Sequence, residues 1–225
     1  MYYISLQCQV VVQSSGIDYE MKMKEPYHHG DLRSALLKGA RKLVEKEGVA
    51  GLSIRKVARA AGVTHAAPYA HFKSKEQIVI ALKEESFREL YEALLEQSPT
   101  PKTPEKKLMA LARGYVGFQL AHPTKFQIMF RNPLQEADPN RPDVKVGLLI
   151  FQRLRAAMEE YLASKRLPKD RSTDLALTAW AMVHGLVSLW IEGPLGYIAA
   201  IDHRDTKGFE ARAEKAVRDF LKSIR

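Results

Sequence analysis

The sequence contains a single cysteine, Cys8, among 225 residues. One cysteine excludes an intrachain disulfide framework, so the chain suits a reducing compartment such as the cytoplasm. No positively charged stretch precedes an apolar one at the start, which argues against a secretory signal. Residues 175–191 form a run of 17 residues without a charged side chain, and this run includes polar side chains. It is short and polar for a membrane span, and we expect a helix buried by its own domain and by a partner chain.

The sequence also lacks the residue patterns of catalytic and metal sites. It has no Gly-x-Ser-x-Gly, no glycine-rich phosphate loop and no His-Glu-x-x-His. His28 and His29 are adjacent, which does not place both rings on one helical face, and no other group has metal-ligand spacing. His184 stands alone in an apolar stretch, which is too little for catalysis. We therefore expect a protein that is not an enzyme and that needs no metal or cofactor.

Basic residues are concentrated in one part of the chain, whose overall net charge is +9 with a pI near 9.5. Residues 26–75 hold ten Lys or Arg against three acidic residues, whereas residues 76–98 hold two against six. Residues 99–225 carry a further net charge of +7, spread over 127 residues. The density of positive charge is therefore highest over residues 26–75, which favours a polyanionic partner for that segment.

Apolar spacing and helix-breaking residues divide the chain into helices joined by loops. Residues 1–24 are unlike the rest and are expected to form a loose extension, with Met21 or Met23 as alternatives to Met1 for the natural start. No run has a convincing sheet pattern, so the fold is expected to be all-α. Three prolines within residues 98–104 indicate a boundary. Helices are expected at about residues 31–47, 54–61, 65–71, 75–97, 105–121, 143–165, 170–192 and 206–223, with a short one opening at 122–123.

The most informative segment is residues 52–75, whose pattern is typical of two short helices joined by a tight turn. Ser53 is a suitable N-cap for the first helix, and Gly62 suits a positive φ at the turn. Thr64 is the N-cap candidate for the second helix, in which Pro68 removes at most one hydrogen bond. A helix-turn-helix of this kind places its second helix in the DNA major groove. Similar helix pairs also occur in all-α proteins that bind no nucleic acid.

Three stretches of this region carry a family resemblance. They are Tyr-His-His-Gly-Asp-Leu-Arg-Ser-Ala-Leu-Leu at 27–37, Gly-Leu-Ser-Ile-Arg-Lys-Val-Ala-Arg-Ala-Ala-Gly-Val at 51–63, and Tyr-Ala-His-Phe-Lys-Ser-Lys-Glu at 69–76. Together they resemble the N-terminal domain of tetracycline-repressor-type (TetR family) transcriptional regulators, over roughly residues 27–95. Trp-Ala-Met-Val-His-Gly at 180–185 is similar to the Trp…His-Gly signature of one C-terminal subgroup of that family. Pro68 stands where many members carry a β-branched residue or leucine.

The resemblance implies a three-helix DNA-binding domain at residues 25–75, followed by a larger helical domain for ligand binding and dimerisation at 76–225. Residues 76–98 would form the long helix that connects the two. Alanines at the start of the reading helix would permit close approach to a thymine methyl group, and a lysine at a helix N-terminus attracts phosphate. The DNA-binding residues implied are Tyr27, His28, Ser53, Arg55, Thr64, His65, Ala66, Ala67, Tyr69, His71 and Lys75. Tyr69 and Phe72 also suit an ordinary core.

One reading helix covers only a few base pairs, so a symmetric homodimer on a palindromic double-stranded operator is expected. The last two helices are the natural interface, through Leu186, Val187, Leu189, Trp190 and Phe220. The resemblance further implies a pocket for a small apolar or aromatic effector. Its candidate lining consists of aromatic, methionine and histidine side chains, which would equally suit a plain hydrophobic core: Tyr115, Phe118, Phe126, Met129, Phe130, Phe151, Trp180 and His184.

These features predict a cytoplasmic, dimeric repressor of TetR type that a small molecule releases from its operator. Two alternatives remain at this point: a helical protein-interaction module without specific DNA binding, and an activator of the same fold. Strong, salt-dependent DNA binding would exclude the first alternative. The position of the operator in the promoter would decide the second.

Overall fold

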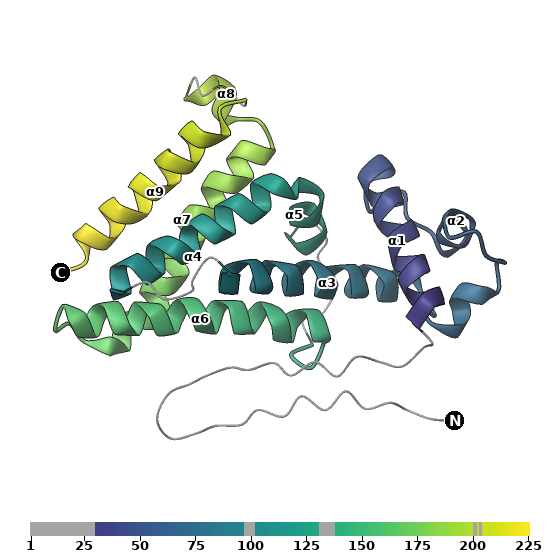
Figure 1. Cartoon of the computed structure of the whole chain (residues 1–225), viewed down its shortest axis with the longest axis horizontal. Helices are drawn as coiled ribbons and strands as arrows, with labels where there is room; N and C mark the ends of the chain where they lie inside the picture. Colours follow the sequence, from purple (N-terminus) through teal and green to yellow (C-terminus); the bar gives the residue numbers. More distant parts are fainter. Residues whose placement is uncertain (1–29, 97–101, 131–137, 200–201, 203) are drawn as a thin grey trace.

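The computed structural model describes residues 30–96, 102–130, 138–199, 202 and 204–225. Every regular element within these ranges is a helix, which confirms the predicted all-α fold (Figure 1). The extension expected at residues 1–24 lies outside the described residues. In chain order the elements are α1 (Gly30–Glu47), α2 (Ile54–Ala60), the 3-10 helix η1 (Ala67–Ala70), α3 (Lys75–Glu96), α4 (Pro104–Ala121), α5 (Pro123–Phe130), α6 (Pro142–Ser164), the 3-10 helix η2 (Lys169–Arg171), α7 (Ser172–Ile191), α8 (Leu195–Ile198) and α9 (Thr206–Ser223).

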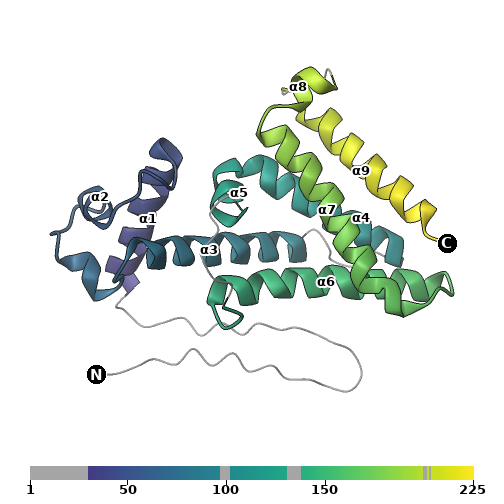
Figure 2. The same ribbon diagram turned by 180° about the vertical axis from the view of Figure 1, so that it is seen from behind.

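The helices form a small head and a larger body that are joined by one long helix. The head consists of α1, α2 and η1 at one end of the molecule, and α3 leads from it into the body (Figure 1). Within the body α3 packs against α4, α5 and α6, and α9 lies along α4 and α7. The view from behind shows the same arrangement, with α4, α7 and α9 together above α3 and α6 (Figure 2).

Two hydrophobic clusters hold these parts together. The head cluster gathers buried side chains of α1, α2 and the first half of α3, among them Leu36, Val57 and Ile78. The body cluster gathers the second half of α3 and the later helices, among them Leu90 and Phe209. Because α3 contributes buried residues to both clusters, burial of its apolar side chains sets the position of the head on the body.

Helix ends follow the local chemistry that the sequence predicts. The Ser53 Oγ accepts a hydrogen bond from the Lys56 backbone N–H at 3.3 Å, which confirms Ser53 as the N-cap of α2. Gly48 and Gly62, just beyond α1 and α2, have φ angles of 69° and 70°, a region that L side chains rarely adopt. Predicted and observed bounds of the long helices differ by one or two residues, the usual uncertainty of helix ends.

The second helix predicted at residues 65–71 is present only as the short 3-10 helix η1 at Ala67–Ala70, so its predicted extent is wrong. Pro68 has no N–H to donate to the Thr64 carbonyl, so the hydrogen bonds close three residues back instead of four. The Ala67 N–H donates to the Thr64 carbonyl at 3.1 Å, and the Tyr69 N–H donates to the Ala66 carbonyl at 3.2 Å. Thr64 also fails as the predicted N-cap, since the residue before η1 is Ala66 and makes no side-chain cap.

The Gly62→Ala substitution is expected to lower the free energy of unfolding by about 1 kcal/mol. Nothing lies within 4 Å of a Cβ built at Gly62, so the positive φ alone carries the cost. Gly117 in α4 is the matched control, because its site is equally open but its backbone is helical. Gly117→Ala is therefore expected to stabilise the protein by about 0.5–1 kcal/mol. Urea unfolding of both variants checks the two signs, and a loss at both positions would contradict the backbone argument.

The helix α7 carries an apolar face that its own protomer leaves uncovered. The segment Lys169–Ile191 is long and apolar enough to cross a membrane by length and composition, yet only 28% of its most apolar window is buried. One side packs against α4, α6 and α9. Leu177 and Leu189 are 50% and 40% exposed. Only part of the burial predicted for this helix is therefore present within the protomer.

Candidate DNA-binding surface and ligand cavity

The helix-turn-helix presents a short row of exposed side chains on the head. Thr64, His65 and Ala66 are exposed in the turn that leads into η1. Tyr69, within η1, is 54% exposed, whereas Phe72 is 3% exposed and belongs to the head cluster. The sequence alone does not decide whether Tyr69 and Phe72 are core or surface residues. In the structure Phe72 is core, and Tyr69 is exposed and available to a partner.

Pro68 shapes this surface from beneath. It is buried, and its carbonyl accepts hydrogen bonds from the N–H groups of His71 at 2.9 Å and Phe72 at 2.8 Å. These two bonds turn the chain back toward the head cluster directly after η1. Ala67 and His71 are half-buried as a result, and Tyr69 remains outside.

Cationic side chains flank the row. Arg55 is exposed on α2. Lys75 is the first residue of α3, and its Nζ donates to the Ala50 carbonyl at 3.2 Å, which holds the ammonium group beside the loop before α2. The charge of a lysine and the unpaired N–H groups of a helix N-terminus both attract phosphate. Tyr27 and His28 lie outside the described residues.

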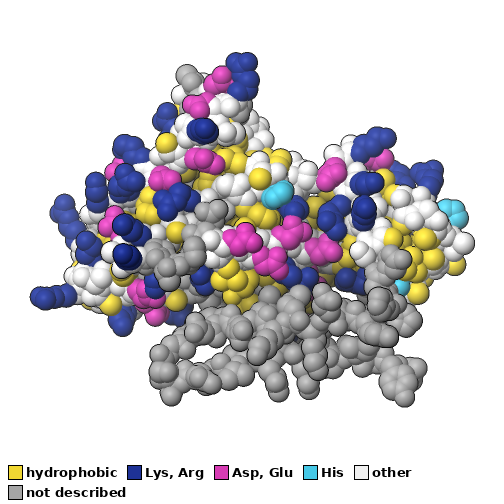
Figure 3. Space-filling model, in the orientation of Figure 1, with side chains coloured by type: hydrophobic (Ala, Val, Ile, Leu, Met, Phe, Trp, Pro, Cys, Tyr) yellow, Lys and Arg dark blue, Asp and Glu magenta, His cyan; other side chains and the backbone are white. Residues whose placement is uncertain are grey.

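Charge is unevenly distributed over the molecule. Figure 3 shows Lys and Arg side chains over the head and again at the opposite end of the body, with acidic side chains gathered between them. The acidic zone agrees with the six acidic residues of the segment 76–98, all of which lie on α3. Anionic DNA is therefore attracted to the head and repelled from the adjoining part of the body. The contacts of individual side chains with DNA remain predictions.

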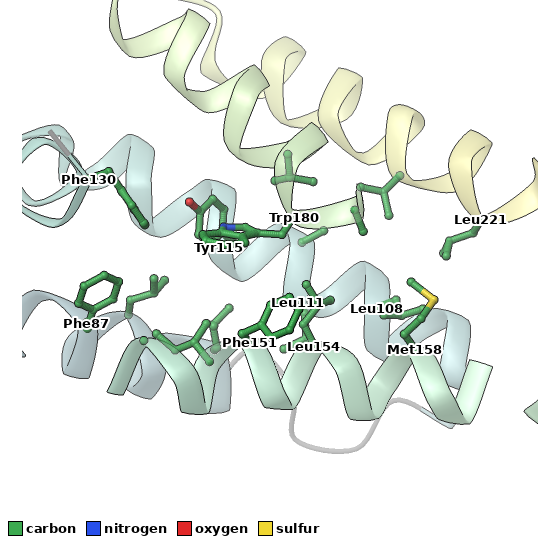
Figure 4. Close-up of a pocket in the computed structure, with 18 residues that line it drawn as sticks. Phe87, Leu108, Leu111, Tyr115, Phe130, Phe151, Leu154, Met158, Trp180 and Leu221 are labelled. Carbon is green, nitrogen blue, oxygen red and sulfur yellow. The ribbon is translucent and has the colours of Figure 1, made fainter. Parts of the chain in front are cut away.

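The body contains an apolar cavity of about 170 Å³ between α3 and α6 on one side and α4, α7 and α9 on the other (Figure 4). Among the described residues that line it none is charged, and polar side-chain groups come only from Tyr115 and Trp180. The lining consists of Phe87, Leu90, Leu94, Leu108, Leu111, Ala112, Tyr115, Phe130, Gly147, Ile150, Phe151, Leu154, Met158, Ala179, Trp180, Val183, Val217 and Leu221.

Half of the predicted lining is found at the cavity, namely Tyr115, Phe130, Phe151 and Trp180. The other half does not line it, which corrects the prediction for Phe118, Phe126, Met129 and His184. Phe126 and Met129 are 0% and 4% exposed within the body cluster, and the Phe118 ring packs 4.8 Å from that of His122. Phe118, Phe126 and Met129 therefore belong to the hydrophobic core, the alternative that the sequence leaves open.

Aliphatic residues of α3, α4, α6, α7 and α9 supply most of the lining that the sequence prediction missed. Leu90, Leu94, Leu154 and Met158 are examples. Their helical spacing was visible in the sequence, but periodicity identifies a buried face and not a void beside it. Only the packing of several helices shows where that void lies.

A hydrogen-bonded polar cluster borders the apolar wall at Tyr115. The Tyr115 hydroxyl lies 2.8 Å from the Nδ1 of His184. Burial raises the pKa of Tyr115 above its ordinary value, opposed by hydrogen bonding from Trp180, so the hydroxyl stays protonated at neutral pH. Gln119 is 0% exposed, and neither of its amide atoms reaches a partner at hydrogen-bond distance within the described chain. Its amide is nevertheless close enough to lower the pKa of Tyr115 slightly.

The short helix α5 connects the cavity with the head. Phe130 lines the cavity, and Ile128, two residues earlier, is 1% exposed and belongs to the head cluster. Phe126 anchors the same helix in the body cluster, with its ring 5.1 Å from that of His184. One short helix therefore contributes a side chain to the cavity wall and another to the head core.

Only part of the predicted dimer interface lies at the surface. Val187 and Trp190 are 0% and 7% exposed, and the Trp190 ring stacks at 4.5 Å on a phenylalanine of α9. This corrects the prediction for these two residues, which fill the core of their own protomer. Leu189 is 40% exposed, and Leu186 and Phe220 are half-buried, so these three remain candidates for an interface.

Comparison with known proteins accounts for both parts of the chain. Residues 36–82 match the bacterial regulatory proteins of the tetR family, and residues 108–212 match the tetracyclin repressor-like C-terminal domain. The chain belongs to the TetR family. The family resemblance predicted from the sequence is thereby confirmed, and with it a DNA-binding transcriptional regulator. The Trp…His-Gly subgroup stays a prediction.

Individual relatives and solved structures are similar over most of the chain. The HTH-type transcriptional regulator AcrR of Shigella flexneri is 25% identical over 198 residues, which cover 82% of this chain and 90% of AcrR. A protein of unknown function from Rhodococcus sp. RHA1 is 30% identical with a TM-score of 0.71, covering 88% of this chain and 98% of that one. FadR of Bacillus subtilis, solved in complex with stearoyl-CoA, is 16% identical with a TM-score of 0.68, covering 86% and 100%. At that identity FadR shows the shared fold alone.

Proposed function

We propose that this TetR-family protein is a homodimeric cytoplasmic repressor that leaves its operator when a small apolar or aromatic molecule enters the body. The observation that carries the proposal is the position of α5. One eight-residue helix places Phe130 in the cavity wall and Ile128 in the head core. Occupancy of the cavity and the placement of the reading head are therefore physically coupled, as ligand-controlled release requires.

Release would be a shift between two populations of the dimer. A ligand that binds one spacing of the two heads more tightly than the other favours that spacing, by no more than its difference in affinity. On a palindrome the two reading elements must lie about 34–36 Å apart, one helical turn of DNA. The complex of FadR with stearoyl-CoA shows that a protein of this fold binds a small molecule, which supports the proposal.

We assign DNA contact to the head, residues 25–75, and ligand binding and dimerisation to residues 76–225. Arg55 and Lys75 are the proposed phosphate contacts, and Thr64, His65 and Tyr69 the proposed contacts at base edges or nearby phosphates. The exposure of Arg55, Thr64, His65 and Tyr69 and the positive charge of residues 26–75 support this assignment. The few long side chains on η1 leave part of the specificity to DNA shape.

Binding to the DNA that flanks the protein's own gene tests the proposal, measured by fluorescence anisotropy at two salt concentrations. Wild type is expected to bind tightly and to weaken as salt rises, because phosphate contacts release counterions. Tyr69→Ala is expected to weaken binding by about 10-fold or more, since a hydrogen bond to a charged group contributes about 1.5–3 kcal/mol and the dimer has two. Tyr197→Ala, on the 81% exposed Tyr197 of α8, is the control and should bind as wild type.

The absence of binding to any such fragment at low salt would overturn the regulator proposal. Equal binding by wild type and Tyr69→Ala would show instead that the protein binds DNA through another surface.

The uncovered apolar face of α7 is the proposed centre of the dimer. Leu189→Asp would place a charge in that interface, and we expect the protein to become monomeric because burying an unpaired carboxylate is costly. Leu148→Asp is the matched control, since Leu148 is a similarly exposed leucine, at 53%, on a different helix, α6. Sedimentation at several concentrations gives the oligomeric state. A dimer that persists in Leu189→Asp would place the interface elsewhere.

A further inference from the structure

The cavity in the body is long and narrow. Its lining on α6 runs from Gly147 to Met158, which spans about 16 Å at the helical rise of about 1.5 Å per residue. Its volume of about 170 Å³ is below the range of roughly 300–1,000 Å³ that is usual for drug-sized ligands. A small volume over such a length favours one slender chain over a broad fused-ring molecule.

The two ends of the cavity differ in chemistry. Figure 4 shows Phe87, Phe130, Tyr115 and Trp180 toward one end, and Leu108, Met158 and Leu221 at the other. The aromatic end holds both polar groups of the lining, the Tyr115 hydroxyl and the Trp180 indole N–H. The far end is aliphatic only. This polarity matches a molecule with one polar group and a hydrocarbon tail.

The polar end suits a neutral hydrogen-bond acceptor. None of the described lining residues is charged, so a buried carboxylate or phosphate there would have no counterion and would be strongly disfavoured. The Tyr115 hydroxyl is protonated at neutral pH, and one hydroxyl can exchange hydrogen bonds with His184 and with a ligand atom at the same time. Gln119, one helical turn from Tyr115, adds a buried amide without a hydrogen-bond partner within the described chain.

We propose that the effector is a single unbranched acyl chain with a neutral carbonyl, as in an ester or thioester. The carbonyl oxygen accepts a hydrogen bond from Tyr115 at the aromatic end, and the tail extends along α6 toward Leu108 and Leu221. This inference rests on the proposed function, in which the cavity holds the effector.

Four probes test the ligand class: methyl decanoate, decanoyl-CoA and decanoate, which share one acyl chain, and naphthalene, a fused ring. Trp180 lines the cavity, whereas Trp190 is packed in the core, so quenching or a shift of tryptophan emission that disappears in Trp180→Phe reports occupancy. The methyl ester or the CoA thioester is expected to bind at least about 10-fold more tightly than decanoate at neutral pH. Binding by the ester alone indicates a free neutral lipid, and binding by both indicates that the head of an acyl-CoA fits outside the cavity. Equal or tighter binding of decanoate or naphthalene overturns the proposal.

Tyr115→Phe tests the position of the carbonyl. The substitution should weaken the binding of methyl decanoate by about 10-fold and leave the binding of decane unchanged, because decane has no oxygen that accepts a hydrogen bond from Tyr115. If both weaken equally, Tyr115 acts only through packing and the assignment of the carbonyl is wrong.

Leu154→Trp tests the course of the tail. It narrows the middle of the cavity, before the aliphatic end (Figure 4), and should shift the preference from decanoyl toward hexanoyl esters, whereas Leu148→Trp on the exposed side of α6 should not. Equal weakening of all chain lengths would contradict the proposed course. These measurements need no DNA. A wild-type protein that binds the ester but no DNA would overturn the proposed function and leave the assignment of the ligand intact.

Discussion

Phe126→Ala is expected to lower the free energy of unfolding by about 3–5 kcal/mol, as large-to-small replacements of buried aromatic residues do. Phe126 is 0% exposed, and its ring lies 5.3 Å from that of Phe130 and 5.1 Å from that of His184. Removing it opens a void where α5 is anchored in the body. Urea unfolding at a fixed protein concentration measures the change, because the stability of the proposed dimer would depend on concentration.

The matched control is Tyr197→Ala, which removes an aromatic side chain that is 81% exposed. Its effect should stay within about 0.5 kcal/mol. A loss below about 1 kcal/mol in Phe126→Ala would show that the surrounding side chains close the void, and that Phe126 is not the anchor of α5.

Asp143→Ala is expected to cost about 3–5 kcal/mol for a different reason, the loss of a buried counterion. Asp143 is 2% exposed and accepts two hydrogen bonds from Arg141, at 2.7 Å from Nε and 3.1 Å from an Nη. Burial lowers the pKa of Lys83, which is 6% exposed, and the charge of Asp143 opposes that shift. Without the carboxylate, the buried ammonium group of Lys83 loses the attraction that keeps it ionised.

A double variant separates charge from packing at this site. Lys83→Met with Asp143→Leu removes the charges of Lys83 and Asp143 and keeps similar volume, so it should recover part of the stability lost in Asp143→Ala, although Arg141 still loses its two hydrogen bonds to the carboxylate. Unfolding of both variants is compared in the same denaturant. A double variant as unstable as the single one would show that the uncompensated charge of Lys83 is not the cause of the loss.

The helices of this protein could be predicted because their ends depend on nearby residues. Ser53 caps α2 and Gly48 ends α1 through contacts within a few residues, and proline opens α4, α5 and α6. The same local chemistry does not predict the form of the reading element η1. Pro68 removes one helical hydrogen bond, and in so short a segment that loss leaves only a single 3-10 turn. The one-turn helix α8 was not predicted either, since four residues carry no periodic signal.

The candidate sites divide in a similar way. The DNA-binding segment is contiguous in sequence, so its motifs could be identified along the chain, although the contacts that they predict with DNA remain to be measured. The cavity draws on α3, α4, α5, α6, α7 and α9. From the sequence His184 and Phe126 are as plausible in its wall as Phe130 and Trp180, because all four are aromatic side chains in apolar helices. Which of them face a void depends on residues far away along the chain.

The sequence by itself determined the helical class, the main helix boundaries, the basic N-terminal segment and the TetR family, because caps, breakers, apolar periodicity and short motifs act locally. The tertiary structure decided which side chains line the cavity, that Val187 and Trp190 belong to the protomer's own core, and that α5 reaches both the cavity and the head. Helical periodicity shows that a face is buried, but only the packing of distant segments shows what buries it and where space remains between them.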